Sequence, residues 1–205
     1  MAPTPAAPPA AASFIPGLYV EQGIASWYGK PFDGRRAADG EIFHMNEMVA
    51  AHRTLPFGSV VRVTNLDNGL QTEVRIIDRG PFVEGRVLDL SHAAARALKM
   101  IGPGTAPVRI ELLYSPMLPA GNFTVQVGAF SQRANADQLR DRLLAHYQPV
   151  VIQEFDEPGQ HYYRVRVGRL PSFDSAQQLA AQLHASDGFE TFVVRLDPSD
   201  EAGAK

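Results

Sequence analysis

The sequence predicts a mainly β fold with an α+β part: a small closed β-barrel with one inserted helix, followed by a βαββαβ domain. Three observations predict this class. Between Gly23 and Tyr114 the apolar residues recur mostly at every second position, which is typical of strands with one buried face. After Asn122, alternating segments flank two stretches with helical spacing. A chain of 205 residues, 45% of them hydrophobic, is long enough for two modest cores.

Alternation is clearest in three segments of the first region. The apolar positions that alternate there with polar ones are Val61, Val63, Val74, Ile76, Val108, Ile110 and Leu112. Asn68 and Gly69 separate the first two segments and tolerate positive φ, so we expect a tight type I′ hairpin. The second segment ends at Asp78, where Gly80 and Pro81 force the chain to turn.

One helix interrupts the strands of the first region. Ser91 is its expected N-cap, and an alanine-rich run reaches Leu98. Gly102 and Pro103 lie beyond its expected end. Together with the strands, this helix predicts a barrel with one helical insertion.

The second region reads as strand, helix, two strands, helix and strand. Ser131 is the expected N-cap of its first helix. The apolar residues expected to face the core are Phe123, Val125 and Val127 on the first strand, Ala136, Leu139 and Leu143 on the first helix, and Leu179 and Leu183 on the second. The other expected strands are Val150 to Glu154 and Tyr162 to Val167, which form a hairpin around Pro158-Gly159, and Thr191 to Val194.

The second region is also internally duplicated. At an offset of 40 residues (165 − 125), Val125 and Gly128 of the first half match Val165 and Gly168 of the second. Such a duplication predicts one four-stranded sheet with two helices on one face and the other face open. On this pattern the open face presents Gln126, Tyr162, Arg164 and Arg166. These side chains suit sugar hydroxyls and acidic substituents, although an exposed sheet face is also polar by default.

The segments divide the chain into five parts. They are a flexible Pro/Ala-rich tether at 1–20, the barrel at 21–114, a linker at 115–121, the second domain at 122–197 and a tail at 198–205.

Composition limits the function classes. The net charge of −3 argues against nucleic acid as a partner, and no stretch is long enough to span a membrane. There is no cysteine, so thiolate metal sites and disulfides are impossible, and the histidine spacing matches no metal motif. We expect no cofactor and no metal. The start of the chain lacks an export signal, so any signal and any lipid-anchor cysteine would belong to a longer precursor.

The barrel region contains the residues that suggest chemistry. Glu41 and Asp78 follow or end probable strands at turns, and His52 lies between them in sequence. A carboxylic acid beside an aromatic wall is suited to protonating a glycosidic oxygen. Taken singly, each of the three is more often structural than functional: Asp78 as a turn aspartate paired with Arg79, Glu41 as a solvated residue, and His52 as a packed histidine bonded to backbone. Asp89, just before the helix, is expected to cap it or to pair with an arginine.

Taken together, the motifs are more specific. GIASWYG, ADGEIF, AAHRTLPFG, VRVTNLDNG, VRIIDRGPF and RVLDLSHAAARAL resemble, in order and spacing, the rare lipoprotein A (RlpA) family. FTVQVGAF and YYRVRVG resemble the SPOR domain that often follows the barrel in that family. The resemblance implies a double-psi β-barrel joined to a SPOR domain that binds peptidoglycan strands stripped of stem peptides.

The activity that the resemblance implies is that of a septal lytic transglycosylase, a carbon–oxygen lyase. It cleaves the β-1,4 bond between N-acetylmuramic acid and N-acetylglucosamine and leaves a 1,6-anhydromuramoyl end. Matched motif by motif, the catalytic residues are Asp78, Glu41 and His52. We expect Asp78 to transfer the protons and Glu41 to stabilise positive charge or share the base role, although the reverse assignment is also open.

The remaining expectations concern substrate, place and partners. Trp27, Tyr28, Phe43 and Phe82 are the candidates for the aromatic wall. Trp27 and Tyr28 are expected to contact substrate, beside Gln126, Tyr162, Arg164 and Arg166. The expected location is the periplasmic side of the outer membrane at the division septum, where the protein acts in daughter-cell separation. We expect a monomer that meets proteins of the division machinery.

Three positions depart from the family pattern. Ala37 stands where threonine is usual, Ile77 where asparagine is frequent, and Arg169-Leu170 where Pro-Phe is common. Loss of the two polar groups near the acidic residues keeps a rival hypothesis open. In that hypothesis the protein is a noncatalytic, septal peptidoglycan-binding protein with a degenerate barrel site.

Overall fold

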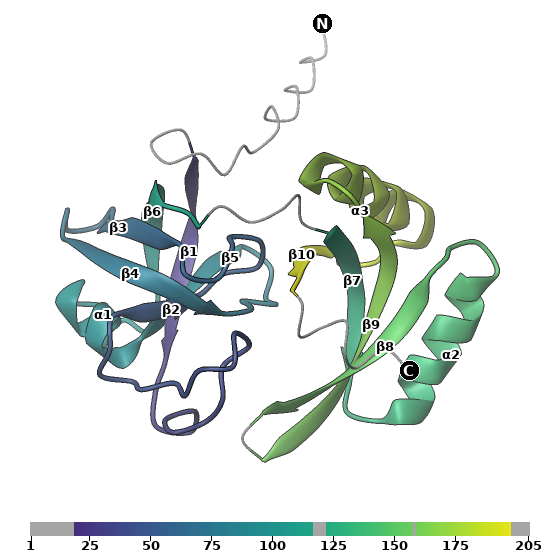
Figure 1. Cartoon of the computed structure of the whole chain (residues 1–205), viewed down its shortest axis with the longest axis horizontal. Helices are drawn as coiled ribbons and strands as arrows, with labels where there is room; N and C mark the ends of the chain where they lie inside the picture. The colour runs from purple at the N-terminus through teal and green to yellow at the C-terminus, as the bar shows by residue number, and fades with distance from the viewer. Residues whose placement is uncertain (1–18, 117–121, 158, 198–205) are drawn as a thin grey trace, which may run out of the picture.

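The computed structural model describes residues 19–116, 122–157 and 159–197, which form two domains side by side (Figure 1). The expected tether, except its last two residues, the expected tail and most of the expected linker lie outside these ranges. Within them, no helix is both long enough and apolar enough to cross a bilayer.

Six strands close into the expected barrel. They are β1 (Val20–Tyr28), β2 (Val49–Ala51), β3 (Val60–Asn65), β4 (Gln71–Asp78), β5 (Arg86–Ser91) and β6 (Ala106–Tyr114). Their order is β1-β5-β2-β4-β3-β6, and pairing of β1 with β6 closes the ring. The β1/β5 and β2/β4 pairs are parallel, whereas the other pairs are antiparallel. A closed barrel is therefore confirmed, in agreement with the double-psi barrel that the resemblance implies.

The residues that alternation singled out all belong to the barrel core, together with residues of β1, β2, β5 and the inserted helix. Val61, Val63, Ile76 and Ile110 are fully buried in one cluster. Helix α1 (His92–Ala97) begins where expected, because the Ser91 hydroxyl accepts a hydrogen bond from the Ala94 N–H. Its buried alanines close one side of the barrel.

The expected type I′ turn between β3 and β4 is wrong, although the two strands do pair. The last regular pair joins Thr64 to Gln71, so the connection is longer than two residues. A type I′ turn needs positive φ at both central residues, and Gly69 has φ 71° whereas Asn68 does not have positive φ. The Asn68 side chain instead binds the Leu70 N–H and the Leu98 C=O, which holds a wider loop against the end of α1.

The second domain has the expected βαββαβ order. Its elements are β7 (Asn122–Phe130), α2 (Arg133–Leu144), β8 (Val150–Glu157), β9 (Gln160–Leu170), α3 (Phe173–Asp187) and β10 (Phe192–Leu196). The strands form one antiparallel sheet in the order β10-β7-β9-β8. Both helices cover the sheet face that is turned away from the barrel (Figure 1). The duplicated halves therefore build one two-layer domain, as expected.

The expected start of α2 is wrong by one residue. Gln132 is the N-cap and makes no side-chain capping bond, so the Ser131 hydroxyl is not at the position that caps the first turn. The helix is held instead by its apolar side, because Ala136, Leu139 and Leu143 are buried against the sheet. By contrast, Ser172 caps α3 through a complete capping box with Ser175.

The expectation that the other sheet face is open is also wrong, because the barrel covers it. Gln126 and Arg166 are each only 3% exposed, and Arg164 is 6% exposed. Contacts between the domains explain this burial: the Arg164 guanidinium lies 4.4 Å from the ring centre of Phe82, a barrel residue. The period of two identified the face correctly, but periodicity carries no information on what packs against that face.

We predict that Ile110→Ala lowers the free energy of unfolding of the barrel by about 2–5 kcal/mol, because it leaves a cavity in a fully buried position. Urea unfolding followed by the fluorescence of Trp27, the only tryptophan, reports on the barrel. Ile42→Ala is the matched control, since Ile42 is 43% exposed, and should change stability by about 0.5 kcal/mol or less. Equal effects of the two variants would contradict the assigned core.

Candidate active site between the two domains

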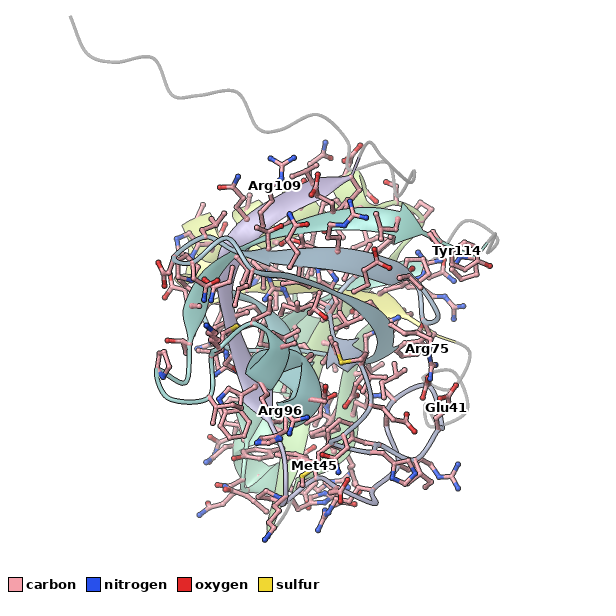
Figure 2. The ribbon with its side chains drawn as sticks, turned by 90° about the vertical axis from the view of Figure 1, so that its left-hand side faces the viewer. Glu41, Met45, Arg75, Arg96, Arg109 and Tyr114 are labelled. Carbon is pink, nitrogen blue, oxygen red and sulfur yellow. The ribbon has the colours of Figure 1, made fainter. Side chains whose placement is uncertain are left out.

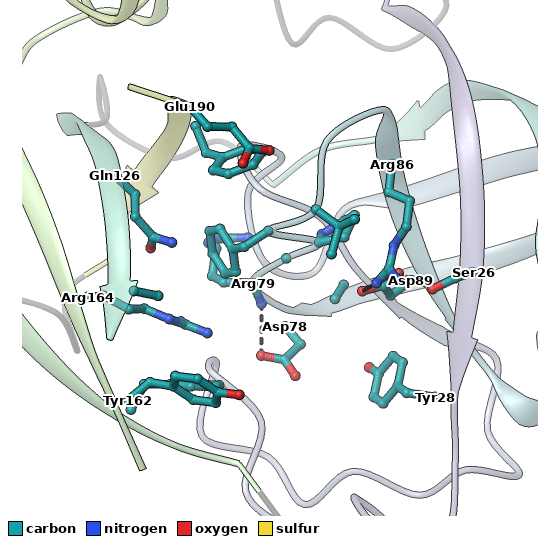
Figure 3. Close-up of a pocket in the computed structure, with 18 of the residues that line it drawn as sticks. Ser26, Tyr28, Asp78, Arg79, Arg86, Asp89, Gln126, Tyr162, Arg164 and Glu190 are labelled. Atoms are coloured by element: carbon teal, nitrogen blue, oxygen red, sulfur yellow. Dashed lines mark hydrogen bonds and ion pairs between the residues drawn. The ribbon is translucent and has the colours of Figure 1, made fainter. Parts of the chain in front are cut away.

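A cavity of about 600 Å³ lies between the barrel and the sheet of the second domain (Figure 3). This volume is within the range of ligand sites, which is about 300–1,000 Å³. Its barrel side carries two carboxylates, and its other side carries an amide, a phenol, a guanidinium and the carboxylate of Glu190. The polar residues on which the following description rests are Tyr28, Asp78, Asp89, Gln126, Tyr162 and Arg164. Residues far apart in the chain therefore meet in one cavity.

Asp78 is positioned by the backbone around it. It ends β4, where the register with β2 shifts between Ala50 and Ala51, an irregularity that re-aims a side chain. Its carboxylate accepts hydrogen bonds from the N–H of Arg79 (2.8 Å) and of Ala38 (3.1 Å). The chain then leaves through Gly80, whose φ of 146° favours glycine. Burial raises the pKa of Asp78, and the two amide hydrogen bonds only partly offset that effect.

The Arg79 side chain points away from Asp78 and holds the two domains together. Its guanidinium forms a buried, bidentate ion pair with Asp197, at 2.7 and 2.9 Å. It also donates to the C=O of His52 (3.0 Å) and of Leu55 (2.9 Å), and it lies 3.6 Å from the ring centre of Phe57. The alternative in which Asp78 pairs with the Arg79 side chain is therefore not observed.

Aromatic residues of β1 form the wall of the cavity opposite the second domain. Trp27 and Tyr28 both line it, as expected. The Tyr28 ring stacks on Phe43 at 4.4 Å. Its buried hydroxyl has no hydrogen-bond partner in the described part of the chain. Burial raises the pKa of Tyr28, and the nearby charges of Asp78 and Asp89 raise it further, so the hydroxyl stays protonated and able to donate.

Asp89 is the second carboxylate of the cavity. The Ser26 hydroxyl and the Arg86 guanidinium, at 2.9 Å, bind it. The expected pairing with an arginine is confirmed, but the sequence reasoning missed that Asp89 faces the same cavity as Asp78. A signal was present: Leu88 and Leu90 on either side are fully buried, so alternation directs Asp89 away from the barrel core.

Glu41 lies elsewhere. Its carboxylate forms a bidentate pair with Arg75, at 2.9 and 2.7 Å, on the outside of the barrel (Figure 2). The Glu41 side chain is 54% exposed and is absent from the residues that line the cavity. Hydrogen bonding to Arg75 lowers the pKa of Glu41. The loop of Glu41 nevertheless contacts Asp78, since it also contains Ala38, whose N–H donates to the Asp78 carboxylate.

His52 contacts the backbone of Asp78 from outside the cavity. Its ring is buried, with Nδ1 accepting from the N–H of Thr54 and Leu55, so the ring proton lies on Nε2, 2.8 Å from Glu21. Burial alone would raise the pKa of Glu21, but contact with His52 and Tyr19 outweighs it and lowers that pKa to about 2. The His52 ring does not line the cavity, but its backbone N–H donates to the C=O of Asp78 at 3.0 Å.

The second domain contributes three of its four expected substrate-binding residues to the cavity. Gln126, Tyr162 and Arg164 line it, whereas Arg166 is buried on the same sheet face outside it. Arg164 lies 3.4 Å from the ring centre of Phe155. The Gln126 carbonyl oxygen is buried and has no partner in the described ranges, and Figure 3 shows its side chain directed into the cavity.

The arrangement suits acid–base chemistry on a polar substrate. Across the described residues, no three histidine, aspartate or glutamate side chains gather closely enough to hold a metal ion. The chemically reactive groups are carboxyl groups, one of which has a raised pKa beside an aromatic wall. A carboxyl group with a raised pKa is better able to act as a general acid and, once ionised, as a base.

We predict that Asp78→Asn is at least as stable as the wild type at pH 7. Because the pKa of Asp78 is raised on folding, the folded state binds more protons between the unfolded value of about 3.9 and the folded value, so stability falls as pH rises through that window. The variant lacks this loss, and its advantage should shrink towards pH 3. Thermal unfolding across pH, with the exposed Asp67→Asn as control, measures it. If Asp78→Asn is less stable at pH 7 than both the wild type and Asp67→Asn, the raised pKa of Asp78 is contradicted.

Comparisons with known proteins identify two families along the chain. The family described as lytic transglycolase matches residues 20–110, and the SPOR domain family matches residues 119–195. Among solved structures, an apo expansin from Clavibacter michiganensis is similar over 88% of this chain and 93% of its own. Its 16% identity and TM-score of 0.39 are too low to carry an argument.

Curated relatives are more similar in sequence. The endolytic peptidoglycan transglycosylase RlpA of Vibrio cholerae is 37% identical over 191 residues, which are 89% of this chain and 72% of that protein. The protein of the same name from Campylobacter jejuni is 40% identical over 58% of this chain, and that from Helicobacter pylori (strain J99) is 41% identical over 60%. The chain spans about half the length of these last two relatives. With its double-psi β-barrel and its SPOR domain, this chain belongs to the RlpA family.

Proposed function

We propose that this protein is an endolytic peptidoglycan lytic transglycosylase. It cleaves the β-1,4 bond between N-acetylmuramic acid and N-acetylglucosamine and leaves a 1,6-anhydromuramoyl end. The observation that carries the proposal is the Asp78 carboxyl, whose pKa is raised by burial in a cavity with an aromatic wall. Membership of the RlpA family supports the same substrate.

The reaction requires two proton transfers and no water. Protonated Asp78 gives its proton to the glycosidic oxygen as the bond from the muramoyl C1 to that oxygen breaks. The C6 hydroxyl of the same sugar then bonds to C1, and its proton goes to the Asp78 carboxylate. One carboxyl group thus acts first as acid and then as base. The Ala38 and Arg79 amides stabilise its ionised form between the two steps.

The oxocarbenium-like centre that forms between the steps needs negative charge nearby. Asp89 lies in the cavity and is held by Ser26 and Arg86. We retain Glu41 in the proposed catalytic set, with His52, and infer that Glu41 acts once substrate draws it from Arg75. An exposed ion pair of this kind is worth only about 0–1 kcal/mol, so little opposes such a movement.

The proposed substrate is a glycan strand that lacks stem peptides. In such strands each muramic acid has a free lactyl carboxylate, for which the Arg164 guanidinium is a suitable partner. The proposed place of action is the periplasmic side of the outer membrane at the division septum, during daughter-cell separation. Proteins of the division machinery are the proposed partners there.

Activity is tested by incubating the protein with peptide-free glycan strands and analysing the products by mass spectrometry for anhydromuramoyl ends. We expect such ends with the wild type and a loss of roughly 10²- to 10⁴-fold with Asp78→Asn, because positioned proton transfer contributes about that much. Retained binding without any product from the wild type would favour the rival function, a noncatalytic peptidoglycan-binding protein.

The same assay tests Glu41. We expect Glu41→Gln to lower product formation strongly while unfolding changes by less than about 1 kcal/mol, since its ion pair is exposed. Glu73→Gln is the matched control: Glu73 is 53% exposed and pairs with Arg62 at 3.1 Å on the same barrel. If Glu41→Gln is as active as Glu73→Gln, Glu41 has only a structural role and Asp89 becomes the second carboxylate to test.

A further inference from the structure

A second cavity adjoins the one around Asp78 at the junction of the two domains. The second cavity has a volume of about 550 Å³ and shares Arg86, Glu190 and Phe192 with the first. It too is lined by both domains, with Arg53 from the barrel and His184 from α3. We treat these two adjoining cavities as one groove, because a series of sites along a junction fits a polymer better than a compact ligand.

The junction that forms the groove is built from specific contacts. Arg79 and Asp197 form the buried ion pair, and the Arg195 N–H donates to the C=O of Arg53 at 3.1 Å. Phe192 packs edge-on against Phe82, with 6.2 Å between the ring centres. Each of these contacts joins the barrel to the second domain, so the groove has walls of defined spacing.

Gln126 points to a ligand inside the groove. It is 3% exposed and its carbonyl oxygen has no partner in the described ranges, which is unfavourable for a buried acceptor unless a ligand supplies a donor. A sugar hydroxyl or the N–H of an acetamido group is such a donor. The unpartnered Tyr28 hydroxyl faces the same cavity from the barrel side. Each domain therefore presents an unpaired polar group to the cavity.

We infer that a single glycan strand occupies this groove and contacts both domains at once, with Gln126 and Tyr162 of the SPOR sheet forming one wall of the active site. The SPOR sheet then selects the substrate for the barrel instead of serving as a separate anchor. This inference rests on the proposed function for the identity of the substrate.

The test uses the full chain carrying Asp78→Asn, so that the probe is not cleaved, and a peptide-free oligosaccharide of two disaccharide units. Trp27 fluorescence reports on the barrel wall, and the side-chain amide signal of Gln126 in NMR reports on the SPOR wall. If one strand fills the groove, both signals saturate together at one oligosaccharide per chain. Signals that saturate at different concentrations, or two oligosaccharides per chain, would overturn the inference.

A second experiment substitutes Gln126 and Tyr162, the residues of the SPOR sheet that form one wall of the groove. Gln126→Ala should weaken the binding reported by Trp27 roughly tenfold, because one hydrogen bond to a buried group is lost. Tyr162→Phe, which keeps the ring, should weaken it several-fold and covers the case in which Gln126→Ala does not fold. Gln178→Ala, on the exposed side of α3, is the matched control and should leave binding unchanged. A Trp27 titration that neither SPOR substitution moves contradicts a shared groove.

The shared groove and the proposed enzymatic function can each fail while the other holds. Joint saturation without anhydromuramoyl product from the wild type would keep the groove as a binding site and reject the enzyme. Product formation with independent saturation of the two walls would keep the enzyme and reject the shared groove.

Discussion

The guanidinium of Arg79 is buried between the two domains, where it pairs with Asp197 and binds two barrel carbonyls. A buried ion pair adds little net stability because both charges lose water, but breaking one side of it is costly. The main effect of the Arg79–Asp197 pair is therefore to fix the position of the two domains relative to each other. It holds the end of β10 against the residue that follows Asp78. Through the Arg79 N–H, the same residue also orients the Asp78 carboxylate.

Docking of the domains explains the polarity of the cavity. Without the barrel, the face of the SPOR sheet that carries Gln126 and Arg164 would be in water; docked, both residues are buried beside Asp78. Burial removes water from around Asp78, and this loss of solvation favours the protonated form that a general acid needs. The burial that raises the pKa of Asp78 thus depends on both domains. The groups that can form hydrogen bonds to sugars also come from both domains.

The departures from the family pattern have a structural setting. Ala37 and Ile77 lie in one small apolar cluster with Phe43 and Val49, just behind Asp78. Here the position of Asp78 is set by backbone amides, from Ala38 and Arg79, and these donors do not depend on the side chains at 37 and 77. Loss of two polar side chains at those positions is therefore compatible with an ordered carboxylate.

Local sequence predicted β3, β4 and β6 of the barrel, its helix and the order of elements in the second domain, but not β2 or β5. Val61 and Ile76 alternate with polar residues because each strand buries one face, and α1 starts at Ser91 because its hydroxyl caps the first turn. The N-cap of α2 was misjudged, since packing of its apolar side and not a capping bond sets where it begins.

The sequence by itself determined that this chain forms a barrel and a βαββαβ domain, because the period of its apolar residues records which side of each element is buried. Only the tertiary structure decided that the SPOR face is covered, that Glu41 pairs with Arg75, and that Asp89 shares the cavity of Asp78. The physical reason is that such contacts join residues far apart in the chain. Their geometry depends on how whole elements and domains pack, which no local pattern encodes.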